Sequence, residues 1–420
     1  MDDRFDIRVD SEIGRLTGVV LHQPGQEVAN MTPETAERAL YSDILNLSVA
    51  TEEYRQLQGV LEKRARTFEM KDLLEDILAN DRVKAGLVRR ICEAEGVPEI
   101  AGELLLLEPA DLSRSLIEGV ALVKDNLSRF LSKDRYSLRP LHNFFFTRDS
   151  SVVVGDKILI ARMANRIRQR EARIAEAVFD FHPLFGARTV NPARLGGGDT
   201  SVTIEGGDVQ VAGPEILVVG IGARTSHKAI DFLIERFKEL GVQRHLIVQE
   251  LPKTPESFIH LDMVFTFLDR DCCMVYEPVI LQTHHFDTVH IHIEGGRVVR
   301  IREEDNLLTA LKGLGQDLKP LFCGGRRDRW IQEREQWHSG ANFFALSPGQ
   351  VIGYGRNSNT IAELDQAGFA VVPAGDVIAG KVDLDAIGRC VVTIDGSELA
   401  RGGGGCRCMT MPIGRRPLTG

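Results

Sequence analysis

Short apolar runs that occur in pairs, separated by glycine-containing turns, restrict most strongly how this chain can fold. Examples are "SVVVGDKILIAR" from Ser151, "DVQVAGPEILVVGIG" from Asp208, "DRDCCMVYEPVILQ" from Asp269 and "GQVIGYGRN" from Gly349. Such pairs are typical of β-hairpins, and the Gly-Asp and Gly-Pro dipeptides mark the turns. Helical patterns such as residues 226–240 fall between them. The pattern therefore predicts an α/β fold in which a β unit followed by a helix recurs.

Repeated small β units favour an arrangement of small sheets around an axis, because this architecture protects strand edges. A doubly wound parallel sheet is the alternative. The segment "GIGARTS" near Gly220 lacks the GxGxxG spacing of a dinucleotide-binding turn and follows a predicted hairpin. The sequence thus favours the radial arrangement over the doubly wound one.

Residues 51–136 differ from the rest of the chain. Apolar residues recur there at three- and four-residue spacing among charged residues, as in "TEEYRQLQGVLEKRARTFEMKDLLEDILAND", and proline is scarce. This periodicity predicts several amphipathic helices. We therefore expect a helical subdomain over residues 51–136, inserted into an α/β domain formed by residues 1–50 and 137–420.

Charge and cysteine content exclude several classes of protein. The net charge of -9 disfavours nonspecific binding to nucleic acid or to an anionic membrane. The acidic N-terminus has no signal-peptide core, so a cytoplasmic location is expected. Seven scattered cysteines argue against a disulfide framework, and "CRC" at 406–408 is a poor zinc signature. We expect no metal and no cofactor, while a homo-oligomer is compatible with the sequence.

Four polar clusters interrupt apolar stretches, and each contains residues suited to catalysis. They are Asn143, Arg148 and Asp149 in "NFFFTRDSS"; Glu205 and Asp208 in "TIEGGDVQV"; His260 and Asp262 in "FIHLDMVF"; and Cys406 and Cys408 after four glycines. If the third cluster is an extended strand, His260 and Asp262 point to the same face. The glycine run is either a flexible tail or a loop around a small substrate.

The clusters together predict a thiol nucleophile, a histidine that exchanges protons and several carboxylates. Carboxylates raise the pKa of a thiol, which opposes catalysis unless the substrate is itself a cation. A guanidinium group held by two carboxylates would supply that charge. Each residue taken alone also has a structural explanation: a turn for Asp149, a hairpin for Glu205, core packing for His260 and Cys408.

Eight segments spread along most of the chain resemble, in the same order, the segments of a known family. They are "GRLTGVVLHQPG", "NFFFTRD", "RIRQRE", "IEGGDV", "GIGARTS", "IHLDMVFTFLDRD", "REQWHSGANFFALSPGQVIGYGRN" and "CMTMPI". In these segments the sequence resembles the arginine deiminases of the guanidino-group modifying superfamily. The resemblance implies a five-bladed pseudo-symmetric α/β propeller, with the helical insertion that distinguishes this family. It further implies hydrolysis of L-arginine to L-citrulline and ammonia without a cofactor.

The resemblance also assigns roles to individual residues. It implies that Cys408, rather than Cys406, is the nucleophile and that His260 is the general acid and base. Asp149 and Asp262 would bind the guanidinium, and Glu205 would orient His260 or hold substrate. The family positions that bind the rest of the substrate match Asn143, Phe146, Arg168 and Arg224.

One departure concerns the glycine loop. Some family members carry an arginine five residues before the nucleophile, where this chain has Gly403, while Arg401 lies two residues earlier. We expect the change to weaken the grip on the α-carboxylate or to shift specificity towards another guanidino compound. Both Arg401 and Gly403 are therefore candidate substrate-binding positions.

Three other functions are compatible with parts of this pattern. An amidinotransferase would share the nucleophile and carboxylates, but the helical insertion and "REQW" favour the deiminase. A dihydrolase would carry arginine beyond citrulline to ornithine and release two ammonia molecules. The third is a noncatalytic, ribosome-binding member of the fold. Such a protein would not need a catalytic set, so the presence of Asp149, Glu205, His260, Asp262 and Cys408 together argues against it.

Overall fold

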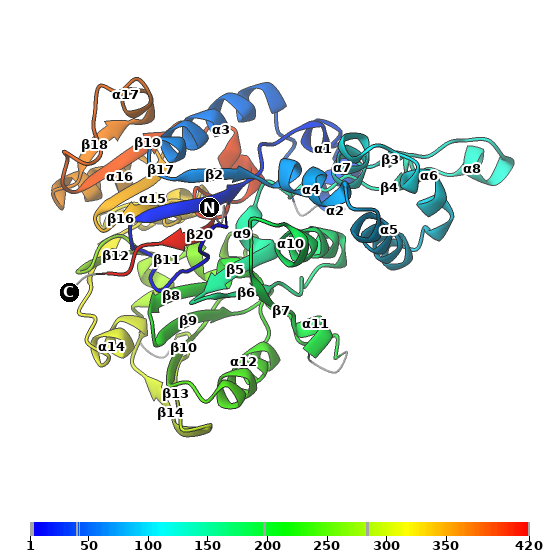
Figure 1. Cartoon of the computed structure of the whole chain (residues 1–420). Coiled ribbons are helices and arrows are strands. Elements are labelled where there is room, and N and C mark those ends of the chain that lie inside the picture. Colours follow the sequence, from blue (N-terminus) through cyan, green and yellow to red (C-terminus); the bar gives the residue numbers. More distant parts are fainter. Residues whose placement is uncertain (1–3, 39–40, 42, 196–198, 283–284, 419–420) are drawn as a thin grey trace.

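A computed structural model describes residues 4–38, 41, 43–195, 199–282 and 285–418 of the chain (Figure 1). It is a mixed α/β fold, and the described residues form six sheets. In spatial order, the sheets are β2 (Arg66–Glu69), β1 (Leu16–Leu21) and β20 (Met411–Arg415); β5 (Ser151–Val154), β6 (Lys157–Ile160) and β7 (Arg188–Val190); β14 (Arg297–Glu304), β13 (Thr288–Glu294), β10 (Arg244–Glu250), β9 (Ile216–Ile221) and β8 (Val209–Gly213); β11 (Phe265–Phe267), β12 (Cys272–Val275) and β15 (Lys319–Phe322); β16 (Phe344–Ser347), β17 (Gln350–Tyr354), β19 (Cys390–Ile394) and β18 (Ala370–Pro373); and β3 (Val120–Ala121) with β4 (Tyr136–Leu138).

The five larger sheets share one pairing scheme. In each, an antiparallel pair is followed by a strand parallel to the second member of the pair, as in β5, β6 and β7 or β8, β9 and β10. The last strand, β20, pairs antiparallel with β1, and β2 lies parallel to β1 on its other side. The predicted hairpins at Ser151 and Asp208 are confirmed by the β5–β6 and β8–β9 pairs. The scheme brings the two ends of the chain into one sheet.

Helices connect the strands and cover the sheets. The α-helices are α1 (Gln26–Ala29), α2 (Pro33–Arg38), α3 (Leu47–Glu62), α4 (Met70–Leu78), α5 (Asp81–Glu95), α6 (Ala101–Leu105), α7 (Pro109–Glu118), α8 (Leu127–Leu131), α9 (Thr147–Ser150), α10 (Gln169–Phe181), α11 (Pro192–Leu195), α12 (His227–Leu240), α13 (Glu277–Ile280), α14 (Leu307–Lys312), α15 (Arg329–Trp337), α16 (Ser358–Gln366) and α17 (Ala374–Ile378). The 3-10 turns are η1 (Pro98–Ile100), η2 (Arg166–Arg168), η3 (Gly206–Asp208), η4 (Glu256–Phe258), η5 (Leu261–Met263) and η6 (Leu399–Gly402). Among the described residues, no helix is both long and apolar enough to cross a membrane.

Helices α4 to α8 project from one side of the sheets as a helical arm (Figure 1). Local chemistry sets their ends: the Asn80 side chain accepts hydrogen bonds from two backbone N–H groups at the start of α5, and Gly96 ends that helix at a φ of 75°. The apolar face of α5, including Leu87 and Ile91, joins the core that contains Val178 of α10. The arm is thus attached to the sheets through one continuous core.

The first part of the predicted helical range 51–136 packs with the sheets rather than with the arm. Helix α3 contacts α17, β2 and β19. Strand β2 pairs in register with β1, from Gly18 opposite Arg66 to Leu21 opposite Glu69. Along the chain, the helical arm therefore begins after β2, at about the start of α4.

Helix α3 also anchors the loop that leads to the predicted nucleophile. The buried Glu53 carboxylate accepts hydrogen bonds from the backbone N–H groups of Ser397 (2.9 Å) and Leu399 (2.8 Å), and both of its oxygens lie 3.1 Å from the nitrogen of Glu398. These N–H groups open η6 and have no earlier helical turn to bond to. Glu53 thus acts as a side-chain cap supplied from another helix.

We expect Glu53→Ala to lower the free energy of unfolding by about 2–3 kcal/mol, because it leaves buried N–H donors without an acceptor. Urea denaturation followed by circular dichroism measures this change. Glu52→Ala, at the exposed neighbouring position on the same helix, is the matched control and should change stability little. Equal stability of the two variants would contradict the anchoring role of Glu53.

Candidate functional site

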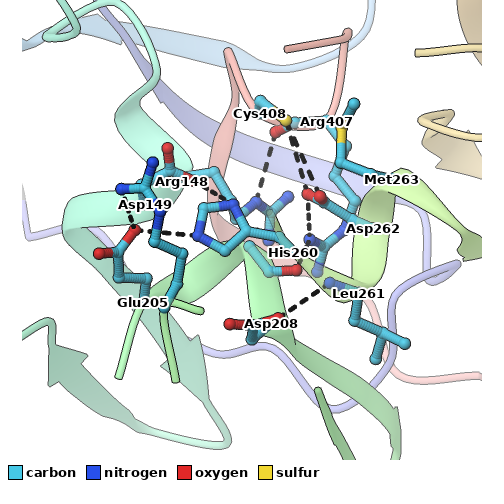
Figure 2. A network of polar contacts seen from close by, with 12 residues as sticks. Arg148, Asp149, Glu205, Asp208, His260, Leu261, Asp262, Met263, Arg407 and Cys408 are labelled. Carbon is cyan, nitrogen blue, oxygen red and sulfur yellow. Dashed lines mark hydrogen bonds and ion pairs between the residues drawn. The ribbon is translucent and has the colours of Figure 1, made fainter. Parts of the chain in front are cut away.

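One pocket contains most of the residues that the sequence analysis singled out. Its wall includes Asn143, Phe146, Asp149, Arg168, Arg224, Gly403 and Cys408. Glu205, His260 and Asp262 are fully buried and lie beside Asp149 and Cys408 rather than on the wall (Figure 2). The five predicted catalytic residues are therefore gathered into one site, although they are spread over 260 positions of sequence.

These residues occupy equivalent positions in the fold. Asp149 lies in α9 immediately before β5, Glu205 precedes η3 and β8, His260 and Asp262 precede β11, and Cys408 precedes β20. Each of these four strands is the first member of an antiparallel pair. The shared pairing scheme therefore brings the segment before the first strand of each pair to a common place.

Cys408 is buried against a carboxylate. Its Sγ lies 3.7 Å from Oδ2 and 3.9 Å from Oδ1 of Asp262 (Figure 2). Burial, and then the negative charges of Asp262 and Asp149, hold the pKa of the Cys408 thiol well above its ordinary value. In this environment the thiol is protonated at neutral pH.

His260 bridges two carboxylates. Its Nε2 lies 2.9 Å from Oε2 of Glu205, and its Nδ1 lies 3.6 Å from Oδ1 of Asp149 (Figure 2). Burial alone would lower the pKa of His260, but the Asp149 charge and the hydrogen bond to Glu205 raise it to about 9. The imidazole is therefore a cation at neutral pH and can donate a proton.

Glu205 is held in its ionised form. Burial raises its pKa, but the hydrogen bond to His260 and the charge of Arg224, whose Nη1 lies 3.7 Å from Oε2, bring the pKa down to about 2. The second oxygen, Oε1, accepts a hydrogen bond from the backbone N–H of Ala164 at 2.9 Å. The carboxylate is thus fixed from both sides and sets the orientation of the imidazole.

The segment that carries His260 and Asp262 is a 3-10 turn, which corrects the extended strand considered in the sequence analysis. His260 has extended backbone angles, but η5 begins at Leu261. The Leu261 N–H donates to Oδ1 of Asp208 at 2.9 Å, and this contact fixes the turn. A Cβ at Gly207 would lie 2.5 Å from Nδ1 of His260, so glycine is required there for the ring to pack.

The predicted substrate-binding arginines differ in their placement. Arg168 lines the pocket, but its Nη1 donates to Asp149 at 2.7 Å and its Nη2 to Glu171 at 2.8 Å. Arg401 lies outside the pocket wall and forms ion pairs with Asp43 and Glu398. The structure thus separates Arg401 from the other candidates, because Asp43 and Glu398 hold its guanidinium group.

Two residues near the nucleophile were missed by the sequence analysis. The buried Arg407 donates to Oδ2 of Asp262 at 2.9 Å, and it also pairs with the buried Glu12 at 3.1 Å. Asn342 donates from Nδ2 to Cys408 Sγ at 3.2 Å. A signal for Asn342 was present, because "NFF" at 342–344 repeats the start of the "NFFF" cluster at 143. No local signal connects Glu12 with Arg407.

Trp337 and Ile259 also line the pocket and were not predicted. Among the described residues, no group of three or more histidine, cysteine, aspartate or glutamate side chains is placed to hold a metal ion. The groups that this site offers for chemistry are its thiol, imidazolium and carboxylates.

Comparisons with known proteins agree over nearly the whole chain. The family model described as arginine deiminase matches residues 37–415. The arginine deiminase of Oenococcus oeni is 30% identical over 435 residues, covering 100% of this chain and 99% of that protein. Among solved structures, the amidinotransferase SxtG of Microseira wollei has a TM-score of 0.55 at 13% identity, covering 99% of this chain and 98% of that one. The N-terminal domain of ArgZ, an arginine dihydrolase from cyanobacteria, has a TM-score of 0.53 at 14% identity, covering 96% and 99%.

We expect Glu205→Gln to lower the pKa of His260 from about 9 towards the ordinary value of 6.5, because the variant removes the negative charge at 2.9 Å. A nuclear magnetic resonance titration of labelled histidine measures this shift. In the wild-type protein, folding raises the pKa of His260. The protonated imidazole therefore contributes fully to stability below about pH 6.5, and this contribution is lost as pH rises through about 9. Glu235→Gln, on the exposed face of α12, is the control. An unchanged titration in Glu205→Gln would contradict the assigned pairing.

Proposed function

Because the chain belongs to the arginine deiminase family, we propose that it hydrolyses L-arginine to L-citrulline and ammonia. The observation that carries this proposal is the thiol of Cys408, 3.7 Å from Asp262, at the bottom of a pocket that also exposes Asp149. A thiol surrounded by negative charge is suited to a cationic electrophile and poorly suited to a neutral one.

Asp149 and Asp262 are proposed to bind the guanidinium group. The buried Oδ1 of Asp149 and Nδ1 of His260 form no hydrogen bond with the described residues. Buried polar atoms normally have partners, so these two atoms are suited to receive a ligand. The Oδ2 atoms of both aspartates already accept hydrogen bonds, from Arg168 and Arg407. Asp149 therefore has one oxygen left for substrate, and Oδ1 of Asp262, 3.9 Å from Cys408 Sγ, is released from the thiol proton when the thiol ionises.

The reaction follows from these positions. Substrate charge lets the Cys408 thiol lose its proton to solvent, and the thiolate attacks the central guanidinium carbon and forms a C–S bond. The His260 imidazolium then protonates one nitrogen, the C–N bond breaks and ammonia departs, leaving a cationic thiouronium adduct and a neutral imidazole. His260 next takes a proton from water as its oxygen attacks the same carbon. The C–S bond breaks, and citrulline, the thiolate and one proton result.

The remaining pocket residues are proposed to hold the amino-acid end of the substrate. Phe146 and Gly403 form part of the wall, and Asn143 and Arg224 supply polar groups to it. Arg224 is the better candidate for the α-carboxylate, since Arg168 is already bonded to Asp149 and Glu171. An arginine fork matches the geometry of a carboxylate.

We also propose that the five larger sheets form a five-bladed pseudo-symmetric propeller around this site. The common strand-pairing scheme and the equivalent positions of the site residues support this arrangement. In the same proposal, the inserted helical subdomain is the arm from α4 to β4. The expected range of 51–136 then shrinks, because α3 and β2 pack with the sheets.

Purified protein given L-arginine is expected to release citrulline and ammonia in equal amounts. Cys408→Ser should abolish turnover, because the serine hydroxyl is far less acidic than a thiol. Cys406→Ser, an equally buried neighbour, is the matched control and should retain a substantial fraction of activity. Colorimetric citrulline and enzymatic ammonia assays measure both products.

The product ratio distinguishes the alternatives. Two ammonia molecules per arginine, with ornithine in place of citrulline, would show a dihydrolase. Turnover that requires an added amine acceptor would show an amidinotransferase. Either result, or a Cys408→Ser variant that remains active, would contradict the proposed reaction.

A further inference from the structure

Asn342 is buried beside the nucleophile and is not among the residues with an assigned role. It lies between α15 and β16 and is 1% exposed. Building on the proposed function, we propose that Asn342 is a further polar residue of the catalytic site, whose amide stabilises the Cys408 thiolate and positions the chain around it.

The orientation of the Asn342 amide follows from its backbone partners. Oδ1 lies 2.8 Å from the nitrogen of Arg407 and 3.3 Å from that of Cys408, and backbone N–H groups can only donate. Nδ2 lies 3.1 Å from the carbonyl oxygen of Asp262, which can only accept. These partners fix which end of the amide carries the hydrogens. The contact of 3.2 Å between Nδ2 and Cys408 Sγ is therefore an N–H group that points at sulfur.

This N–H group matters most when the thiol is ionised. Among the described contacts of Sγ, the Asp262 oxygens accept a hydrogen bond from the thiol, whereas Asn342 donates one to the sulfur. Once the proton has left, the carboxylate can only repel the sulfur, and Asn342 remains as a side-chain donor to it, together with the backbone N–H of Gly405. A neutral amide provides this stabilisation without adding positive charge that would repel a guanidinium.

The position of Asn342 in the fold agrees with this role. Four of the five larger sheets supply a candidate catalytic residue from the segment before the first strand of their antiparallel pair. Asn342 holds the same position in the remaining sheet, before the β16–β17 pair. It is thus the counterpart of Asp149, Glu205, the His260–Asp262 pair and Cys408.

The glycine run of the nucleophile loop fits against this side chain. A Cβ at Gly405 would lie 2.6 Å from Oδ1 of Asn342, closer than side-chain carbons approach an oxygen. A Cβ at Gly404 would similarly lie 2.5 Å from the ring of Phe146. Glycine at these positions lets Asn342 and Phe146 reach the backbone, so the loop is shaped by close packing.

The test is a titration of the Cys408 thiolate in the full-length protein, which needs no substrate. Thiolate ultraviolet absorbance is recorded against pH, and the curve of Cys408→Ser is subtracted. Asn342→Leu removes both the donor and the acceptor at similar volume. Asn342→Asp keeps an acceptor for the two backbone N–H groups while replacing the amide donor. Asn357→Leu removes another buried asparagine amide, bonded to the His338 carbonyl at 2.9 Å, and is the matched control.

We expect both Asn342 variants to reduce the thiolate fraction at a given pH by about tenfold or more, and Asn357→Leu to leave it unchanged. On arginine, the Asn342 variants should lose about 10- to 100-fold in kcat with little change in KM, as for removal of a donor to a reacting anion. Thiolate curves for both Asn342 variants that match wild type would overturn the proposal. Because this titration is independent of turnover, an inactive protein would contradict the proposed function and leave the Asn342 result readable.

Discussion

Negative charge buried around a thiol is the constraint on which the site depends. Asp149, Glu205 and Asp262 belong to the same polar network as Cys408 and are almost completely buried (Figure 2). Burial, and then the charges of Asp262 and Asp149, raise the pKa of the Cys408 thiol. The charge of Asp149 and the hydrogen bond to Glu205 at 2.9 Å hold His260 in its cationic form. The resting site is thus a protonated thiol beside an imidazolium. In the proposed mechanism, a guanidinium between the two aspartates reverses the electrostatic penalty on the thiolate, so that the substrate helps to create its own nucleophile.

Such buried charge is costly unless each carboxylate has a partner. The structure pairs Asp149 with Arg168 and Asp262 with Arg407, and Glu12 balances Arg407 from the other side. The fold also holds the site in place from both sides of the nucleophile. Strand β20, which follows Cys408, pairs with β1, and the Glu53 carboxylate of α3 caps the turn before the glycine loop. The site is therefore assembled only when both ends of the chain are in place.

Residues that interrupt apolar runs were predictable from sequence, and this signal singled out the clusters that contain Asp149, Glu205, His260, Asp262 and Cys408. The choice of Cys408 over Cys406 came from the family resemblance. Predictions that depended on local conformation were less successful. The segment at His260 is a turn because Asp208, far away in sequence, accepts the Leu261 N–H group. Arg401 was expected at the pocket from its position in the glycine loop, but Asp43 and Glu398 hold it elsewhere. Glu12 and Arg407 are 395 residues apart, so only the fold brings them together.

In the proposed mechanism, a cation in the pocket ionises Cys408. The most direct measurement compares thiolate absorbance at neutral pH in the presence of guanidinium ion and of urea, which has nearly the same shape and no charge. Both are used at non-denaturing concentration, with Cys408→Ser as the blank. The account predicts a saturable rise in thiolate with guanidinium and none with urea. Equal responses to the two compounds, or no response to guanidinium, would contradict it.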